Sequence, residues 1–287
     1  MLALSGGSGR SPVPLDLIGC GDSHTLNEGT GVLPHEFYPG QLQRMLAVAK
    51  NANLVVVNAG HSGNTSSDLL MEANLRATPA RPFAGVVYVG TNDYGLANRS
   101  AVQASPSPTS TAFGIETGKG ARFRAGDVIF VGGVSRTILS VAADLVTLTA
   151  PLPGAPSAGV GVQLDTTEMI VKIGNKLLSI GYTRLIVGLQ HYLNFSTSGD
   201  TTSPAQGTGM NLTLRNQQRA AAATLGAEVA DFYEFMRKRI IDGKDVQGSA
   251  GWHVADLNTH LNAYGERLLA ECITAAIPTS WYPALQQ

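Results

Sequence analysis

The segment "LDLIGCGDSHT", residues 15–25, sets the fold class of this chain. It begins as a short apolar run and stops abruptly at glycine, aspartate, serine and histidine. Unbroken apolar runs of this length are typical of central strands in a parallel sheet, because such strands are buried on both faces. Gly, Asp and Ser are also ordinary loop residues. The segment alone is therefore compatible both with a plain strand-ending turn and with a serine presented for chemistry.

Strands and helices alternate on either side of the insertion described below. Further strands are predicted over residues 53–60, 84–93, 184–190 and 227–232, and helices over 37–51, 66–77, 166–181, 212–226 and 262–277. This alternation predicts a parallel sheet that helices cover on both faces. We expect an α/β fold with a five-stranded parallel sheet.

Residues 104–164 interrupt the alternation. A stretch rich in Ser, Pro, Thr and Gly is followed by three β-rich segments separated by short turns. This pattern predicts a small antiparallel β-subdomain. The α/β domain is then discontinuous, with residues 1–103 and 165–287 on either side of the insert. An insertion costs the host fold little when its ends lie close together.

Composition narrows the classes of partner. The formal net charge is -1 and 14% of residues are charged, so no basic stripe is available for nucleic acid. Cys20 and Cys272 lie in apolar contexts and are expected to be buried free thiols. No signal peptide is recognised and no apolar run reaches the roughly 20 residues that span a bilayer, so no membrane span and a cytoplasmic location by default are expected.

Polar clusters follow several of the predicted strands. They are "GDS" at 21–23, "NAGHSGNT" at 58–65, "GTND" at 90–93 and, after the fifth strand, "WHVADLNTHLN" at 252–262. The carboxyl ends of parallel strands share one edge of a sheet, and their loops converge on one crevice. The four clusters together predict one site at that edge.

Acyl transfer needs a nucleophile, a base and donors for the developing oxyanion. Ser23 can be the nucleophile. His260 is the best base candidate because it lies in the turn before the last predicted helix. The backbone N–H of Gly63 and the side-chain amide of Asn92 can complete an oxyanion hole with the N–H of Ser23.

These residues resemble a known family. Its four signature blocks are matched, in order, by "GDS" at 21–23, "NAGHSGNTS" at 58–66, "GTND" at 90–93 and "HLNAYG" at 260–265. The chain is thus similar to the SGNH hydrolases, also called GDSL esterases and lipases, over most of its length outside the insert. The resemblance implies a flavodoxin-like three-layer α/β/α sandwich. It also implies ester hydrolysis through the four residues named above, without a metal or a cofactor.

Two positions depart from the family pattern. The family usually has an aspartate three residues before the histidine, where this chain has Leu257, and Asp256 stands one residue further back. Either Asp256 still reaches the imidazole as the third catalytic residue, or a backbone carbonyl orients His260. His24 replaces a commonly aliphatic residue, which predicts a more polar pocket.

The loops suggest a hydrated substrate. A polar loop at 194–211 and the lack of an apolar lid favour O-acetyl groups on a carbohydrate or polysaccharide over a lipid. The expected substrate contacts are His24, Tyr94, Tyr192, Trp252 and His253. Trp252 is alternatively a core residue, and His253 is alternatively the base. The insert either contacts carbohydrate or mediates packing, including contact with a second copy of the chain.

The segment at 123–152 loosely resembles β-modules of viral tail and surface-attachment proteins. This likeness suggests a phage-associated deacetylase located in a virion or tail, with the insert as a possible assembly contact. Two other functions stay open. One is a lipase or thioesterase of the same family, which needs an apolar acyl pocket. The other is a non-catalytic glycan-binding protein or structural tail component.

Overall fold

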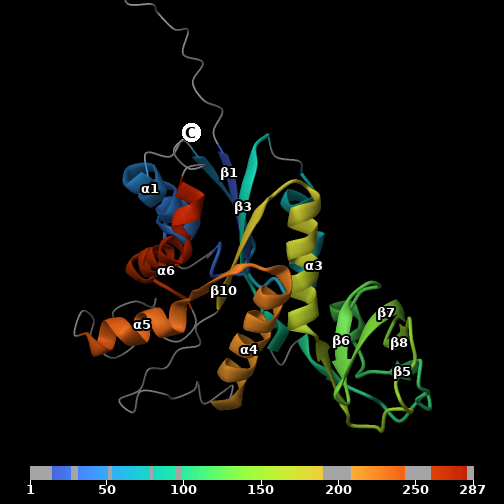
Figure 1. The fold of residues 1–287 in the computed structure, drawn as a ribbon. Coiled ribbons are helices and arrows are strands. Elements are labelled where there is room, and N and C mark those ends of the chain that lie inside the picture. Colours follow the sequence, from blue (N-terminus) through green and yellow to red (C-terminus); the bar gives the residue numbers. More distant parts are fainter. Residues whose placement is uncertain are drawn as a thin grey trace, which may run out of the picture.

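The computed structural model describes residues 15–26, 32–50, 54–77, 80–94, 98–189, 208–242 and 260–282. Within these ranges the chain forms one five-stranded and one six-stranded sheet (Figure 1). The first sheet is covered by helices, and the second forms a separate body beside it. The predicted fold class, an α/β sheet carrying an inserted antiparallel β-subdomain, is confirmed.

The five-stranded sheet is parallel throughout. Its strands are β1 (Leu15–Gly21), β2 (Leu54–Gly60), β3 (Pro82–Tyr88), β10 (Arg184–Leu189) and β11 (Glu228–Asp231). The spatial order is β11-β10-β3-β1-β2. This is the flavodoxin-like order, in which ligands bind where the strand order reverses, between β1 and β3.

Helices cover both faces of this sheet. They are α1 (Tyr38–Lys50), α2 (Ser66–Met71), α3 (Thr166–Ser179), α4 (Thr208–Leu225), α5 (Phe232–Ile241) and α6 (Ala263–Ala276). Side chains of β1 alternate between two cores. Leu17 packs into a core with α1, α5 and α6, whereas Ile18 and Cys20 pack into a second core with α2, α3 and α4. The three-layer sandwich is confirmed.

The sequence pattern does not predict helix α5. The segment "FYEFMRKRII" is rich in aromatic and β-branched residues, which are weak helix formers. It also follows β11 directly, with no loop to mark its start. Phe232 and Met236 are buried in the core that contains α6, so tertiary packing stabilises the helix. Short 3₁₀ turns complete the described elements at Pro34–Glu36, Ala73–Arg76, Asn92–Tyr94, Gly120–Arg122 and Thr279–Trp281.

The six-stranded sheet is antiparallel. Its strands are β4 (Ser100–Ala101), β5 (Ala112–Gly114), β6 (Val128–Val131), β7 (Val134–Ala142), β8 (Leu145–Leu148) and β9 (Gly161–Leu164), in the order β4-β9-β6-β7-β8-β5. The three segments β6, β7 and β8 form the predicted meander. A bridge between Val102 and Ile115 connects the two edges, so the sheet curls around its own apolar core.

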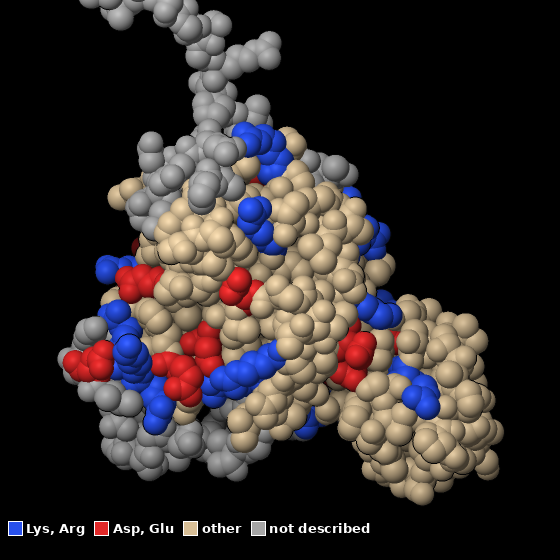
Figure 2. All heavy atoms as spheres, in the orientation of Figure 1, with Lys and Arg blue, Asp and Glu red and all other residues tan. Residues whose placement is uncertain are grey.

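Charged side chains on the visible face gather over α4, α5 and α6, whereas the inserted sheet is mostly uncharged there (Figure 2). Ion pairs such as Arg215–Asp231 and Arg239–Glu271 connect these helices and β11. Cys20 and Cys272 are buried free thiols, as predicted, and burial raises the pKa of both. Among the described helices, none has both the length and the apolar character needed to cross a bilayer.

The carboxyl group of Glu266 connects α6 to α1 inside the core. Its Oε2 accepts a hydrogen bond from the backbone N–H of Tyr38 at 2.9 Å, at the first residue of α1. Glu266 is fully buried, and burial raises the pKa of its carboxyl well above the usual range. The fold therefore uses the acceptor oxygen, whereas a negative charge at this position is unfavourable.

We expect Glu266→Gln to keep or increase stability at neutral pH, because an amide retains the acceptor without a buried charge. Because the pKa of Glu266 is raised on folding, the wild-type protein loses stability as pH rises above the usual carboxyl range. At lower pH the Glu266 carboxyl is protonated in both states, so Gln has no advantage over it there. Glu266→Ala leaves the Tyr38 N–H unsatisfied and costs about 1–3 kcal/mol. Urea denaturation of the three proteins at several pH values measures this. Equal losses for Gln and Ala at neutral pH would contradict the assignment.

Candidate active site

A tight turn at the end of β1 carries Ser23. The N–H of His24 donates to Asp22 Oδ1 at 3.1 Å, and the N–H of Thr25 donates to the Asp22 carbonyl at 2.9 Å. Asp22 therefore holds the turn, as its short side chain beside a glycine predicts. Ser23 is 7% exposed and lies at the carboxyl end of a central strand.

Only glycine fits before this turn. A Cβ at Gly21 would lie 2.0 Å from Thr25 Oγ1 and 2.4 Å from the carbonyl oxygen of Tyr88 on β3. Asn58 fixes the turn from the other side. Its Nδ2 donates to the Thr25 carbonyl at 2.9 Å, and its Oδ1 accepts from the Gly60 N–H at 2.8 Å. The sequence pattern assigns Asn58 no role, although its place at the start of the polar cluster 58–65 was an available signal.

The loop after β2 carries Gly63. The His61 N–H donates to the Gly21 carbonyl at 3.1 Å, and the Asn64 N–H donates to the His61 carbonyl at 3.2 Å, closing a four-residue turn. Gly63 is its third residue and has φ of +81°, in the region that favours glycine. A Cβ there would meet no atom within 4 Å, so backbone conformation, and not crowding, requires the glycine.

Asn92 follows β3 and contacts the same loop. Its Nδ2 donates to the carbonyl of Asn64 at 2.9 Å, and an amide group carries a second hydrogen for another acceptor. The structure thus joins the segments that hold two of the predicted oxyanion donors, Gly63 and Asn92. Their roles as donors remain predictions.

His260 lies near the carboxyl end of β1, beside His24. It stands two residues before Asn262, whose side chain caps α6 by accepting from the Gly265 N–H at 2.9 Å. The ring centroids of His260 and His24 are 5.9 Å apart. His24 is buried and also meets the ring of Tyr88 edge-on at 5.8 Å. The predicted base is therefore next to the residue that follows the predicted nucleophile.

Of the remaining predicted site residues, the structure describes Tyr94 and does not describe the other four. Tyr94 is buried, its hydroxyl donates to Gln217 of α4, and the Arg99 guanidinium lies 5.0 Å above its ring. Its hydroxyl is thus bonded within the fold. The other predictions fall outside the described residues: Tyr192, Trp252, His253 and Asp256.

Asp93 connects three elements beneath the site. Its carboxylate accepts from the Ser66 N–H at 2.8 Å, the Ser66 hydroxyl at 2.7 Å and the Thr166 hydroxyl at 2.9 Å. It thereby holds the first residues of α2 and α3 against the end of β3. Burial raises the pKa of Asp93 to about 6, although the three hydrogen bonds favour the charged form.

The described part of the site has the Ser23 hydroxyl, the His260 imidazole and two candidate amide donors, Gly63 and Asn92, at the carboxyl ends of the strands. This combination is suited to acyl transfer through a serine nucleophile. Over the ranges that the structure describes, no three His, Cys, Asp or Glu side chains are grouped in a way that could hold a metal ion.

Comparison with known proteins gives a family match over most of the chain. The model of the GDSL-like Lipase/Acylhydrolase family matches residues 20–268. No curated protein sequence matches.

Several solved structures are similar in fold. Acetylxylan esterase Axe2 from Geobacillus stearothermophilus has 14% identity and a TM-score of 0.53, covering 93% of this chain and 95% of its own. A lipase/acylhydrolase from Enterococcus faecalis has 16% identity and a TM-score of 0.51, covering 94% and 97%. The alpha/beta hydrolase LAE5 from the metagenome of Lake Arreo has 14% identity and a TM-score of 0.52, covering 92% and 96%. At these identities the likeness shows the fold alone.

Asp93 predicts a pH dependence of stability. Because its pKa is raised from 3.8 to about 6 on folding, the folded protein holds a proton that the unfolded chain lacks between these values. Stability therefore falls as pH rises through this window. Relative to Asp93→Asn, the wild-type protein should lose roughly 3 kcal/mol of unfolding free energy between acid and neutral pH. Urea titrations across the window measure the difference.

Asp144→Asn is the matched control. Hydrogen bonds from the Gly118 and Gly120 amides lower the pKa of Asp144, so its contribution is lost only in stronger acid. The measured quantity is the difference in unfolding free energy between the wild-type protein and each variant, followed against pH. If this difference is as independent of pH for Asp93→Asn as for Asp144→Asn between pH 3.8 and about 6, Asp93 does not titrate with a raised pKa.

Proposed function

This chain belongs to the GDSL-like lipase/acylhydrolase family, the SGNH hydrolases, and we propose that it is a serine esterase that removes O-acetyl groups from a carbohydrate. The observation that carries the proposal is the meeting of distant segments at the carboxyl ends of β1, β2 and β3. The Ser23 turn, the Gly63 loop, Asn92 and His260 all lie there.

The proposed reaction has two halves. Ser23 Oγ attacks the ester carbonyl carbon while His260 takes the hydroxyl proton. The tetrahedral intermediate collapses, the alcohol leaves with the proton from His260, and an acetyl-serine remains. Water then attacks this ester while His260 takes its proton, the bond from the acyl carbon to Ser23 Oγ breaks as His260 returns that proton to Oγ, and acetic acid is released. Asp256 or a backbone carbonyl orients the imidazole.

The oxyanion is proposed to accept hydrogen bonds from the N–H groups of Ser23 and Gly63 and from the Asn92 amide. Donors that are already fixed stabilise the transition state most, because they need no reorganisation during the reaction. The bond from Asn92 to the Asn64 carbonyl at 2.9 Å supports this view, since it orients the amide in the absence of substrate.

We expect Ser23→Ala to abolish hydrolysis of p-nitrophenyl acetate, and Asn92→Ala to lower kcat by about 10²–10³, the usual effect of losing one oxyanion donor. Asn216→Ala, an exposed position on α4, is the matched control and should retain full activity. Circular dichroism confirms that each variant is folded. Near-normal kcat in a folded Asn92→Ala protein would remove Asn92 from the oxyanion hole.

Two observations support a short acyl group on a sugar. The predicted loop at 194–211 is polar, and Axe2, which is similar in fold, is an acetylxylan esterase. The family also includes lipases, and the Enterococcus faecalis protein that is similar in fold is called a lipase/acylhydrolase. The alternative is therefore an enzyme for acyl-chain esters, which needs an apolar pocket.

The two substrate classes are separated by acyl-chain length. We expect kcat/KM to fall steadily from nitrophenyl acetate to nitrophenyl octanoate, and acetate to be released from acetylated xylan or another acetylated polysaccharide. A rise of kcat/KM with chain length would favour a lipase or thioesterase. Release from polysaccharide that is equal for wild type and Ser23→Ala would favour a non-catalytic protein.

A further inference from the structure

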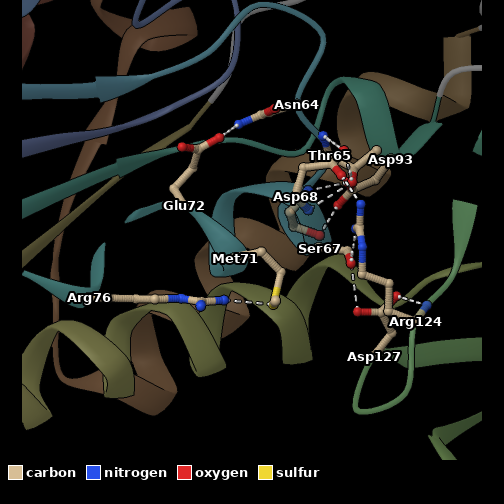
Figure 3. A network of polar contacts seen from close by, with 11 residues as sticks. Asn64, Thr65, Ser67, Asp68, Met71, Glu72, Arg76, Asp93, Arg124 and Asp127 are labelled. Atoms are coloured by element: carbon tan, nitrogen blue, oxygen red, sulfur yellow. Dashed lines mark hydrogen bonds and ion pairs between the residues drawn. The ribbon is translucent and has the colours of Figure 1, made fainter. Parts of the chain in front are cut away.

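The inserted sheet is fastened to the first turn of α2 by side chains (Figure 3). Arg124 and Asp127 lie in the turn before β6. Asp127 Oδ1 accepts from the Ser67 hydroxyl at 2.7 Å. Arg124 donates to the Ser67 hydroxyl oxygen at 2.8 Å and to Asp68 Oδ1 at 2.5 Å. The insert therefore contacts the helix that follows the Gly63 loop.

The hydrogen bond between Ser67 and Asp127 is the buried part of this junction. Ser67 is 1% exposed and Asp127 is 3% exposed. Asp127 Oδ2 also accepts from the backbone N–H of Arg124 at 2.7 Å, so both of its oxygens are bonded. A buried carboxylate is tolerated only when its hydrogen bonds are made with good geometry. The contact therefore fixes the position of α2 relative to the insert.

From α2, hydrogen bonds continue to the candidate oxyanion donors. Asp68 Oδ2 accepts from the Thr65 N–H at 3.0 Å and from its hydroxyl at 2.8 Å. Asn64, the residue before Thr65, accepts from Asn92 Nδ2 through its carbonyl at 2.9 Å and donates to Glu72 Oε1 through its side-chain amide at 3.0 Å. The Gly63–Asn64 segment is thus held at its C-terminal end by the helix that the insert contacts.

We propose that Arg124 and Asp127 are positioning residues, through which the inserted sheet braces α2 and so fixes Gly63 and Asn92 for ester hydrolysis. The inference deepens the proposed function and rests on it for its kinetic readout. The physical reason is that a shift of about 1 Å in a catalytic donor can cost about 10²-fold in rate. Neither Arg124 nor Asp127 is required to touch substrate.

The insert has a second set of contacts that bypass α2. Lys172 Nζ of α3 donates to the Gly126 carbonyl at 2.6 Å, and the Val128 N–H donates to Met169 Sδ at 3.3 Å. Lys172 is the matched control, because it is also a cation that connects the insert to the α/β domain. Lys172→Ala removes the hydrogen bond to Gly126 and part of the positive charge near Asp127, but it deletes none of the hydrogen bonds that Ser67 and Asp68 of α2 make with the insert.

The test compares Arg124→Ala, Asp127→Asn and Lys172→Ala. For nitrophenyl acetate, we expect kcat to fall about 10- to 100-fold in the first two with KM unchanged, because transition-state stabilisation alone is lost. Lys172→Ala should keep both parameters. The Arg124 side chain is 40% exposed, so its truncation leaves no large internal cavity.

The second readout needs no activity. Hydrogen–deuterium exchange without substrate should speed up in peptides that cover residues 61–70 in Arg124→Ala and Asp127→Asn, but not in Lys172→Ala. Three results would overturn the positioning role of Arg124 and Asp127: unchanged exchange in residues 61–70, unchanged kcat, or an increase in exchange that is spread evenly over all peptides. A different result would separate the two proposals. If exchange at residues 61–70 speeds up as expected but Ser23→Ala hydrolyses the ester as fast as the wild-type protein, the contact between the insert and the loop is supported and the proposed function is wrong.

Discussion

The parallel pairing of β1 with β2 and β3 is the constraint on which the site depends. Gly21, the last residue of β1, is in register with Gly60 of β2 and with Tyr88 of β3. The polar clusters after the three strands therefore start from one level of the sheet. The strand order reverses between β1 and β3, so the connections that follow these two strands lead to helices on opposite faces of the sheet and leave room for a ligand between them.

The sequence predicts those features that depend on long apolar runs or on polar clusters that follow several strands. Unbroken apolar runs predict the central strands β1, β3 and β10, because a strand buried on both faces has no polar alternation. Convergence of strand ends predicts that the segments of Ser23, Gly63 and Asn92 meet, whatever the fine geometry. Two-residue strands such as β4 give no periodic signal, and α5 forms against its intrinsic propensity because Phe232 and Met236 are buried.

The contacts that hold the site in place are much harder to predict. Ser67 and Asp127 lie 60 positions apart, and neither belongs to a recognisable motif. Asp93 is next to Asn92 in the sequence, which suggests a local turn role, yet its carboxylate bonds Ser66 and Thr166 on two other elements. Such partners follow from how the helices and the insert pack, and a single sequence carries no direct record of that packing.

Two buried carboxyl groups hold neighbouring residues of α2 from different directions. Asp93 bonds Ser66 from the end of β3, and Asp127 bonds Ser67 from the insert. Burial raises the pKa of both, so each charged carboxylate costs stability at neutral pH. Apolar contacts would avoid this cost, but they would allow α2 to slide. Because α2 begins directly after the loop that contains Gly63, fixing its first turn also limits the positions that this loop can take.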